Sequence, residues 1–407
     1  MPKENPSSIL GTSDTGIRGS NQAGMRAHNE RLVLSLIRRH GATAKADIAR
    51  ATGLSAQTVS VIMRALEADE LLMRGEPVRG RVGQPSIPMS LAPDGAFFFG
   101  LKVGRRSLEL VLTDFLGKVR ARVRQTHDYP MPEATVRFTR NALTRMLTAM
   151  TPRDRDRVAG LGIAMPFSLW DWADNLSAPH EDMAAWRNAD LGRSISRVID
   201  IPVLVQNDAT AACGAELVFG RDETPVDFLH FYIGYFIGGG VVLNGSLYSG
   251  PGGNAGAVGS MPVPAQEPGG RDRQLIDVAS LGGLEERLVA AGLDTSELWD
   301  TPEQLEMQPD VLSDWIEDAA AGIAHAIASA VSVIDFGTVM IDGWITQDMR
   351  RRLVEATTTH LEKRNMAGLA TPDVREGSIG ADARALGAAS LPLSERYLVE
   401  RLAFQSA

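Results

Sequence analysis

The sequence predicts a mixed α/β protein with a separate, mostly helical domain at its front. Three segments with apolar residues at helical spacing fill residues 24–68. Apolar runs typical of strands recur from residue 97 onward, and glycine-rich turns accompany them between residues 203 and 261. The chain has 407 residues, 44% of them hydrophobic and 22% charged, which is enough for two or three domains with cores of their own.

Composition restricts the setting in which the protein works. The single cysteine, Cys213, excludes a disulfide framework, indicates a reducing compartment and is expected to be buried. The first residues lack the apolar core of a signal peptide, and no run of 18 apolar residues occurs. We therefore expect a cytoplasmic protein without a membrane partner.

Charge is unevenly distributed along the chain, whose formal net charge is −9. Residues 1–92 hold 12 Lys and Arg against 8 Asp and Glu, whereas the remainder holds 29 against 42. A basic front on an acidic body is expected when one part meets phosphate groups and the other does not. An ordinary solvated surface also explains so small a surplus.

The front of the chain is predicted to hold a flexible leader, residues 1–23, and a winged helix-turn-helix domain, residues 24–92. The leader is rich in Ser, Gly, Asn and Pro without periodicity. Helices are expected from residue 24 to about 40, over 45–52, and after Ser55, which would be the N-cap of the third helix. The second helix should bury Ala46, Ile48 and Ala49, and the third Val59, Ile62, Met63 and Leu66.

The third helix is expected to enter the major groove of double-stranded operator DNA. Its outer face offers an amide suited to adenine, several hydroxyls, and an arginine within reach of phosphate. The candidate DNA contacts on this helix are Ser55, Gln57, Thr58, Ser60 and Arg64. A helical bundle that docks another protein is the alternative interpretation.

The segment from Gly75 to Pro88 is predicted to form a β-hairpin wing. Its tip carries Arg79 and Arg81 between glycines, which suits the negative potential of a narrow minor groove. These two arginines complete the candidate DNA contacts. A solvated linker between domains is the alternative.

The body is predicted to open with three successive strands, over residues 97–103, 107–114 and 119–124. A helix over about 132–150 and a buried strand from Val158 should follow. A loop over residues 167–185 comes next, with Trp170, Trp172 and Trp186 as packing residues or as platforms for a sugar ring. Later elements are a long helix over 310–334, a strand from Thr338 and a C-terminal helix from Ala381. In the second of the first three strands, Leu108, Leu110 and Leu112 should share one face of the sheet.

A polar pair, Asn207-Asp208, follows the run 201–205, which is expected to be a buried strand, and opens a helix. In open α/β sheets ligands bind beyond the carboxyl ends of strands, so the amide and carboxylate suit the hydroxyls of a small polyol. The alternative is an ordinary N-cap, because Asn and Asp are preferred there.

The runs Asn207-Asp208-Ala-Thr-Ala-Ala, Gly238-Gly-Gly and Gly253-Asn-Ala-Gly-Ala-Val-Gly resemble the ROK family, which groups repressors and sugar kinases. The resemblance covers nearly the whole chain and implies an actin-like (ribonuclease H-like) fold of two lobes for the body. The first lobe would span residues 93–206, completed by about 385–407, and the second residues 207–384. Repressors of this family carry an N-terminal winged helix-turn-helix, as expected here.

The resemblance also indicates that the kinase machinery is lost. Where ROK kinases have an Asp-x-Gly-Gly-Thr loop for metal and phosphate, this chain has Lys102-Val-Gly-Arg-Arg. Tyr235 and Phe236 fill the second phosphate loop, and Asp342-Gly-Trp replaces the glycine cluster beside adenine. The zinc-binding histidine and cysteines of the family are absent, so neither a metal nor another cofactor is expected.

On the sugar side, the resemblance assigns Asp208 to the position of the catalytic base, here a hydroxyl acceptor only, and Asn207 and Glu285 to sugar contacts. Ser260 replaces the family histidine and would widen the pocket. We therefore expect a transcriptional regulator and not an enzyme: a sugar-responsive repressor of carbohydrate transport or catabolism genes that binds operator DNA as a homodimer or tetramer. An ATP-dependent sugar kinase and a regulator controlled by a protein partner are the alternatives.

Overall fold

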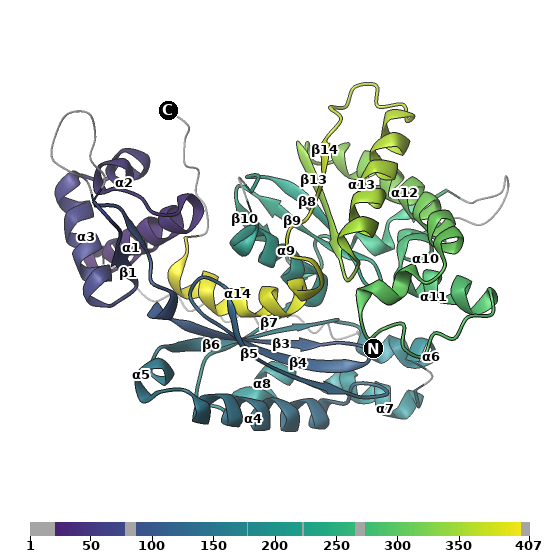
Figure 1. The fold of residues 1–407 in the computed structure, drawn as a ribbon, viewed down its shortest axis with the longest axis horizontal. Coiled ribbons are helices and arrows are strands. Elements are labelled where there is room, and N and C mark those ends of the chain that lie inside the picture. Colours follow the sequence, from purple (N-terminus) through teal and green to yellow (C-terminus); the bar gives the residue numbers. More distant parts are fainter. Residues whose placement is uncertain (1–20, 78–86, 177, 222–223, 265–272, 400–407) are drawn as a thin grey trace, which may run out of the picture.

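The computed structural model describes residues 21–77, 87–176, 178–221, 224–264 and 273–399. These residues form a small N-terminal domain and two larger lobes (Figure 1). The N-terminal domain consists of α1 (Asn21–His40), α2 (Lys45–Thr52), α3 (Ala56–Ala68), β1 (Leu72–Arg74) and β2 (Met89–Leu91). No helix among the described residues has the length and apolar character needed to cross a membrane.

The three helices of the N-terminal domain follow the predicted pattern closely. Gly53 adopts a positive φ of 69° after α2, as the tight turn requires, and the Ser55 side chain accepts a hydrogen bond from the Thr58 N–H. Two details differ from expectation: α1 begins at Asn21, inside the expected leader, and Ala46 is exposed. The helices bury Val33, Ile37, Ile48, Val59, Ile62, Met63 and Leu66 in one core.

The strands β1 and β2 pair antiparallel, with Leu72 opposite Leu91, and form the base of the predicted wing. A backbone bond from the Gly75 N–H to the Pro88 carbonyl continues the pairing. The tip of the wing, with Arg79 and Arg81, lies outside the described residues.

The first lobe is built on a five-stranded sheet of order β5-β4-β3-β6-β7. As predicted, three antiparallel strands come first and leave Leu108, Leu110 and Leu112 in one core. The helices α4 and α8 cover this face of the sheet, and α14 lies on the other (Figure 1). The main elements are β3 (Phe97–Val103), β4 (Ser107–Thr113), β5 (Val119–Thr126), α4 (Pro132–Ala149), α5 (Pro152–Arg155), β6 (Val158–Met165), α8 (Leu191–Ser196) and β7 (Val203–Asn207).

Two expectations for this lobe are wrong. The strand β7 is half-exposed rather than buried, because it forms the edge of the sheet, and Val205 is 42% exposed. The segment expected to be a loop, residues 167–185, contains several short helical turns. These are η2 (Leu169–Trp172), α6 (Ala173–Leu176), α7 (His180–Ala184) and η3 (Ala185–Asn188).

The second lobe has a sheet of order β10-β9-β8-β13-β14. One face packs against α9 around Cys213, which is fully buried as predicted, and the other against the long helix α12. The main elements are α9 (Asp208–Phe219), β8 (Phe228–Ile233), β9 (Gly238–Leu243), β10 (Ser246–Tyr248), β11 (Pro262–Val263), β12 (Arg273–Gln274), α10 (Leu275–Ala279), α11 (Leu281–Ala290), α12 (Pro309–Val331), β13 (Thr338–Gly343), α13 (Gln347–Glu362) and β14 (Asp373–Glu376).

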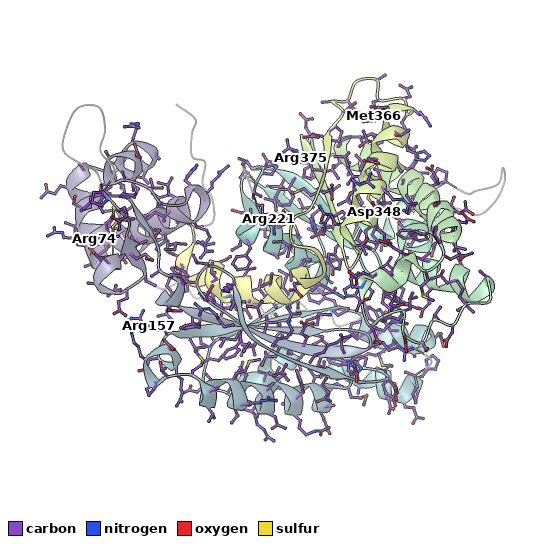
Figure 2. All side chains as sticks on the ribbon, viewed as in Figure 1. Arg74, Arg157, Arg221, Asp348, Met366 and Arg375 are labelled. Atoms are coloured by element: carbon purple, nitrogen blue, oxygen red, sulfur yellow. The ribbon has the colours of Figure 1, made fainter. Side chains whose placement is uncertain are left out.

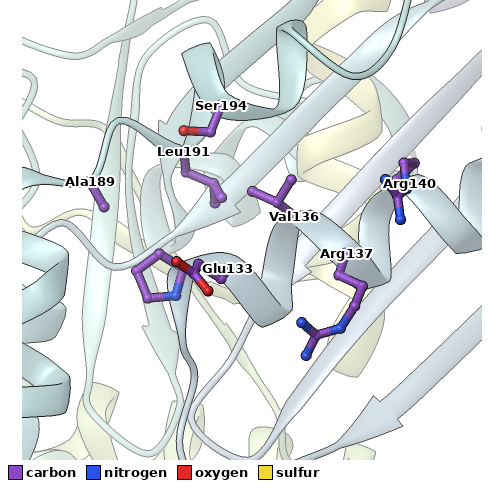
Figure 3. A pocket seen from close by; sticks show the side chains of 8 residues that line it. Glu133, Val136, Arg137, Arg140, Ala189, Leu191 and Ser194 are labelled. Atoms are coloured by element: carbon purple, nitrogen blue, oxygen red, sulfur yellow. The ribbon is translucent and has the colours of Figure 1, made fainter.

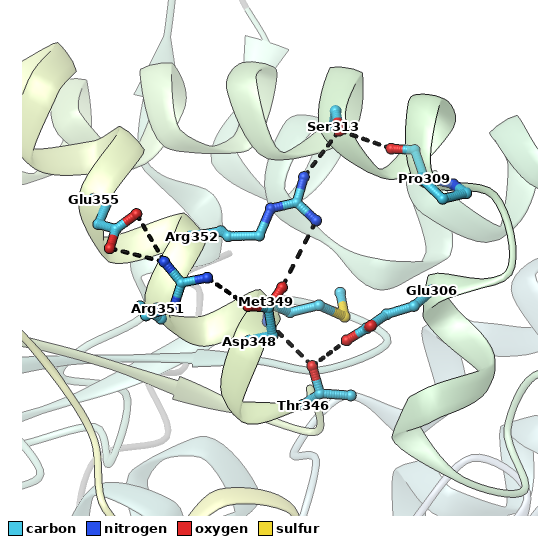
Figure 4. A network of polar contacts seen from close by, with 9 residues as sticks. All are labelled: Glu306, Pro309, Ser313, Thr346, Asp348, Met349, Arg351, Arg352 and Glu355. Carbon is cyan, nitrogen blue, oxygen red and sulfur yellow. Dashed lines mark hydrogen bonds and ion pairs between the residues drawn. The ribbon is translucent and has the colours of Figure 1, made fainter.

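Polar contacts fix the outer helix α13 against α12 (Figure 4). The hydroxyl of Thr346 accepts from the Met349 N–H at 3.1 Å, which caps α13, and itself donates to Glu306. Farther along, Arg352 donates to the Ser313 hydroxyl on α12 at 2.9 Å. These contacts hold the two helices of the second lobe together.

The C-terminal helix α14 (Ala383–Tyr397) returns to the first lobe, as predicted, and packs along α9. Glycines permit the close approach. A Cβ at Gly162 of β6 would lie 1.8 Å from the Ala388 carbonyl oxygen, and a Cβ at Gly387 would lie 1.9 Å from that of Ala211. The two helices therefore form one packed unit between the N-terminal domain and the second lobe (Figure 1).

His230 of β8 makes the stability of the second lobe sensitive to acid. Its side chain is fully buried, burial lowers its pKa to about 4, and neither ring nitrogen has a hydrogen-bond partner among the described residues. In the unfolded chain the His230 imidazole binds a proton below about pH 6.5, whereas in the folded protein it does so only below about pH 4. The free energy of unfolding should therefore fall between about pH 6.5 and 4, by up to about 3 kcal/mol.

Urea denaturation of wild type and His230→Gln across this pH range measures the effect, and the variant should show a flatter profile. His28 is exposed, so His28→Gln provides the control and should show the same dependence of unfolding free energy on pH as wild type. Equal slopes for wild type and His230→Gln would contradict the assignment.

Candidate functional site

The outer face of α3 presents most of the predicted DNA contacts to solvent. Gln57 and Arg64 are exposed, and Ser60 is half-buried. Arg64 is held against its own helix by a bond from its Nε to the Ser60 carbonyl at 3.2 Å. The hydroxyls of Ser55 and Thr58 bond to each other at 2.8 Å, so their geometry serves the helix cap.

Two arginine contacts fix the N-terminal domain to the body. At the end of α1, the Arg38 guanidinium lies 5.2 Å from the Phe115 ring centroid and 5.8 Å from that of Phe219, and it donates to the Phe115 carbonyl. Burial lowers its pKa to about 10. Tyr397 packs edge-on against Phe115 at 5.1 Å. This aromatic cluster joins the domain to the ends of α9 and α14.

A second contact is made by Glu70, just after α3, which pairs with Arg153 and Arg157 of the first lobe. Arg157 also donates to the backbone carbonyls of Asp69 and Gly95. Figure 2 labels Arg157 at this boundary, below the N-terminal domain. Both sets of contacts thus hold the N-terminal domain against the first lobe.

Asn207 and Asp208 lie at the junction of β7 and α9. The side-chain amide oxygen of Asn207, Oδ1, accepts from the N–H groups of Ala209 and Thr210 at 3.1 and 3.2 Å, so the N-cap interpretation is correct for this side chain. The Asp208 carboxylate lies 3.3 Å from an Arg384 nitrogen. About a sixth of each of these two charged side chains remains exposed, at 17% and 16%. Sequence reasoning did not identify the partner of Asp208, Arg384.

A second ion-pair network lies beside this junction, on the sheet of the first lobe. Lys102 of β3 stands opposite Glu109 of β4, with Nζ 3.5 Å from the carboxylate. Arg122 of β5 contacts the same carboxylate at 2.7 Å and also Asp382, just before α14. Burial, and then repulsion from Arg384, lowers the pKa of Lys102 to about 8.

Glu285 is engaged across the lobes by Arg105, in the turn between β3 and β4. One guanidinium nitrogen lies 3.4 Å from the Glu285 carboxylate, and the Trp299 indole N–H donates to the same carboxylate at 2.9 Å. The guanidinium also lies 3.5 Å from the Tyr235 ring centroid and 5.0 Å from that of Trp299. Burial lowers the pKa of Arg105.

Aromatic rings extend this contact. Phe236 packs edge-on against Trp172 of the first lobe at 5.1 Å, and Trp344 stacks on Trp299 at 5.3 Å. Trp186, in contrast, is buried and donates to the Pro130 carbonyl, so it is a packing residue. We call the set Arg105, Trp172, Tyr235, Phe236, Glu285, Trp299 and Trp344 the interlobe cluster.

Two further positions singled out in the sequence are not members of this cluster. Ser260 is exposed in the short turn η4 (Val258–Ser260). Asp342 is fully buried and accepts from Arg350 at 2.9 Å and from the Gly380 N–H at 2.7 Å. Among the residues with described positions, no three His, Cys, Asp or Glu side chains are grouped to hold a metal.

A surface pocket of about 340 Å³ lies on the first lobe, between α4 and α8 (Figure 3). Val136 and Leu191 form its apolar wall, and Glu133, Arg137 and Arg140 lie at its polar side. None of the predicted sugar contacts lines it.

Comparisons with known proteins agree with this architecture. The ROK family model matches residues 98–395, and a model described as winged helix-turn-helix DNA-binding matches residues 26–73. The protein y4fQ of Sinorhizobium fredii is 27% identical over 379 residues, 92% of this chain and 93% of that protein. The xylose repressor of Bacillus subtilis is 24% identical over 249 residues, 61% of this chain and 64% of the repressor.

Solved structures share the fold. A ROK family transcriptional regulator, described as a homolog of the Escherichia coli MLC protein, superposes with a TM-score of 0.66 at 20% identity, over 92% of this chain and 97% of that one. A ROK family glucokinase from Streptomyces griseus, solved with glucose and AMPPNP, gives 0.55 at 20% identity, over 73% and 99%. Since the family model covers most of the chain, this protein belongs to the ROK family.

Proposed function

We propose that the protein is a DNA-binding transcriptional regulator, a sugar-responsive repressor of carbohydrate transport or catabolism genes. The observation that carries the proposal is the recognition helix α3, with Gln57 and Arg64 exposed, in a domain fixed to a ROK body by Arg38 and Glu70. The similarity to a xylose repressor and to several proteins named transcriptional regulators supports it.

The interlobe cluster supports a regulator rather than a kinase. Phosphoryl transfer requires backbone loops and cations around the phosphates, and a free carboxylate as base. Here Arg105 and aromatic rings occupy the space between the turn after β3 and the turn after β8, and Asp208 is paired with Arg384. Coupled turnover with ATP and a panel of sugars tests this directly, and activity abolished by Asp208→Asn would establish the kinase alternative.

The proposed effector contacts are Asn207, Asp208, Glu285 and Ser260. Because its oxygen caps α9, Asn207 would offer its amide N–H groups to a ligand. Asp208 and Glu285 would exchange their arginine partners for hydroxyls. A palindromic operator implies a homodimer or a tetramer of two such pairs, which we include in the proposal.

Mobility shift on the DNA upstream of the protein's own gene tests the proposal, with and without monosaccharides, sugar acids and sugar phosphates. We expect a specific complex that at least one of these compounds weakens. A specific complex that no compound changes would favour control by a protein partner, and no specific complex would contradict the regulator itself.

Substitutions on α3 should separate sequence reading from phosphate contact. Gln57→Ala should weaken specific binding by about 10-fold or more and relax preference at one position. Arg64→Ala should weaken binding to all DNA sequences alike and reduce by about one the slope of log affinity against log salt concentration. Arg193→Ala, at an exposed position of α8 on the first lobe, is the matched control and should bind as wild type. Wild-type binding by both α3 variants would exclude this helix face from the interface.

A further inference from the structure

Two buried cations, Lys102 and Arg384, act on each other, and each has a long contact to its carboxylate partner. Lys102 and Arg384 have side chains only 10% and 16% exposed. Their carboxylate partners are 3.5 and 3.3 Å away, longer than the 2.7–2.9 Å of strong charge-assisted hydrogen bonds. Both pairs can therefore be exchanged for a better-placed acceptor at limited cost.

Unsatisfied polar atoms lie at the same place. The Nε atom of Arg384 is buried without a hydrogen-bond partner among the described residues. The buried Tyr232 hydroxyl interacts with the Arg384 side chain, and its own proton has no acceptor among those residues. Tyr232 is 2% exposed, and the Arg384 guanidinium lies 5.3 Å from its ring centroid. A buried donor without an acceptor costs free energy, so these donors favour an incoming acceptor.

The local charge balance favours an anion over a neutral group. Burial, and then the positive charges of Arg384 and Arg124, lower the pKa of Lys102, whereas the Glu109 carboxylate raises it. Glu109 is itself shared with Arg122. An anionic group between Lys102 and Arg384 would relieve their repulsion in a site largely removed from water, where such interactions are strong.

We propose that Lys102, Arg384 and the Tyr232 hydroxyl form an anion-binding subsite beside Asp208, so that the effector is an anionic carbohydrate, a sugar phosphate or a sugar acid. The anion would accept from these three donors while the freed Asp208 carboxylate accepts from a sugar hydroxyl. This inference rests on the effector role proposed above for Asp208.

Isothermal titration calorimetry on the full chain tests the subsite with glucose, xylose, glucose 6-phosphate, gluconate and inorganic phosphate. We expect at least one of the two anionic sugars to bind at least about 10-fold more tightly than both neutral sugars. Comparison of glucose 6-phosphate with gluconate then tells whether phosphate or carboxylate is preferred. Equal or tighter binding of a neutral sugar, or no binding by any probe, would overturn the proposal.

Variants assign the effect to the named residues. Lys102→Gln and Arg384→Gln should each lower the affinity for the anionic sugar by at least about 10-fold, and Tyr232→Phe should lower it by a smaller factor. Arg384→Lys keeps the charge and should restore part of the affinity. The exposed Arg106, changed to Gln, is the control for charge near the site and should bind as wild type. If Lys102→Gln and Arg384→Gln fold and bind the anionic sugar with unchanged affinity, the proposed subsite is wrong.

Operator binding without ligand, measured on the same preparations, keeps the two proposals apart. A protein that shifts its operator but binds only neutral sugars would remain a regulator and lose the anion subsite. A protein that binds anionic sugars without shifting DNA would keep the subsite and lose the proposed function.

Discussion

Gly162→Ala is expected to lower the free energy of unfolding by about 3 kcal/mol or more, since the new methyl group would overlap backbone rather than a movable side chain. Its carbon would lie 1.8 Å from the Ala388 carbonyl oxygen and 2.7 Å from the carbonyl carbon. Relief would require α14 to move off the sheet of the first lobe. Urea denaturation followed by circular dichroism measures the change.

The control for this substitution is Gly252→Ala. No atom lies within 4 Å of a Cβ built there, so the same added methyl group should change stability by no more than about 0.5 kcal/mol. If Gly162→Ala were as stable as this control, α14 would not pack on β6 as described.

Arg105→Ala is expected to destabilise the contact between the lobes by about 2–3 kcal/mol. The substitution removes a guanidinium that is 9% exposed and leaves the Glu285 carboxylate without its cation. This loss of stability is smaller than for a fully buried ion pair because the Glu285 side chain is 21% exposed. Thermal unfolding should show the loss, and tryptophan emission should change because Trp299 faces the guanidinium.

Arg106→Ala tests whether this effect belongs to the cluster or to charge in the turn. Arg106 is the exposed neighbour of Arg105 and should be replaceable with little change in stability or emission. Similar losses for both arginines would mean that the turn between β3 and β4, and not the interlobe cluster, determines stability.

Most elements of the fold could be predicted because their patterns are local. The three helices of the N-terminal domain, with Ser55 as N-cap, follow from apolar spacing and capping chemistry. The first three strands of the body follow from alternation of apolar residues, which places Leu108 and Leu110 in the core. The long helix α12 and the close packing of α14 on the first lobe were expected too.

The errors concern properties that depend on distant parts of the chain. The run before Asn207 is apolar enough for a buried strand, but β7 is the last strand of its sheet and keeps one side open. The ion pair of Arg105 with Glu285 joins residues 180 positions apart, and that of Arg384 with Asp208 joins residues 176 apart. The sequence could nominate Asp208 and Glu285, but it could not show that each already has a cationic partner.

The paired helices α9 and α14 connect the two ends of the molecule. Asp208 and Arg384 lie at their first turns, and Phe219 and Tyr397 end them beside the N-terminal domain. With 12 and 15 residues, the helices are about 18 and 22 Å long. A tilt of about 10° at one end moves the far end by about 4 Å at this length. The paired helices therefore connect the Asp208–Arg384 ion pair directly to the N-terminal domain, and such a displacement equals about a tenth of one turn of DNA.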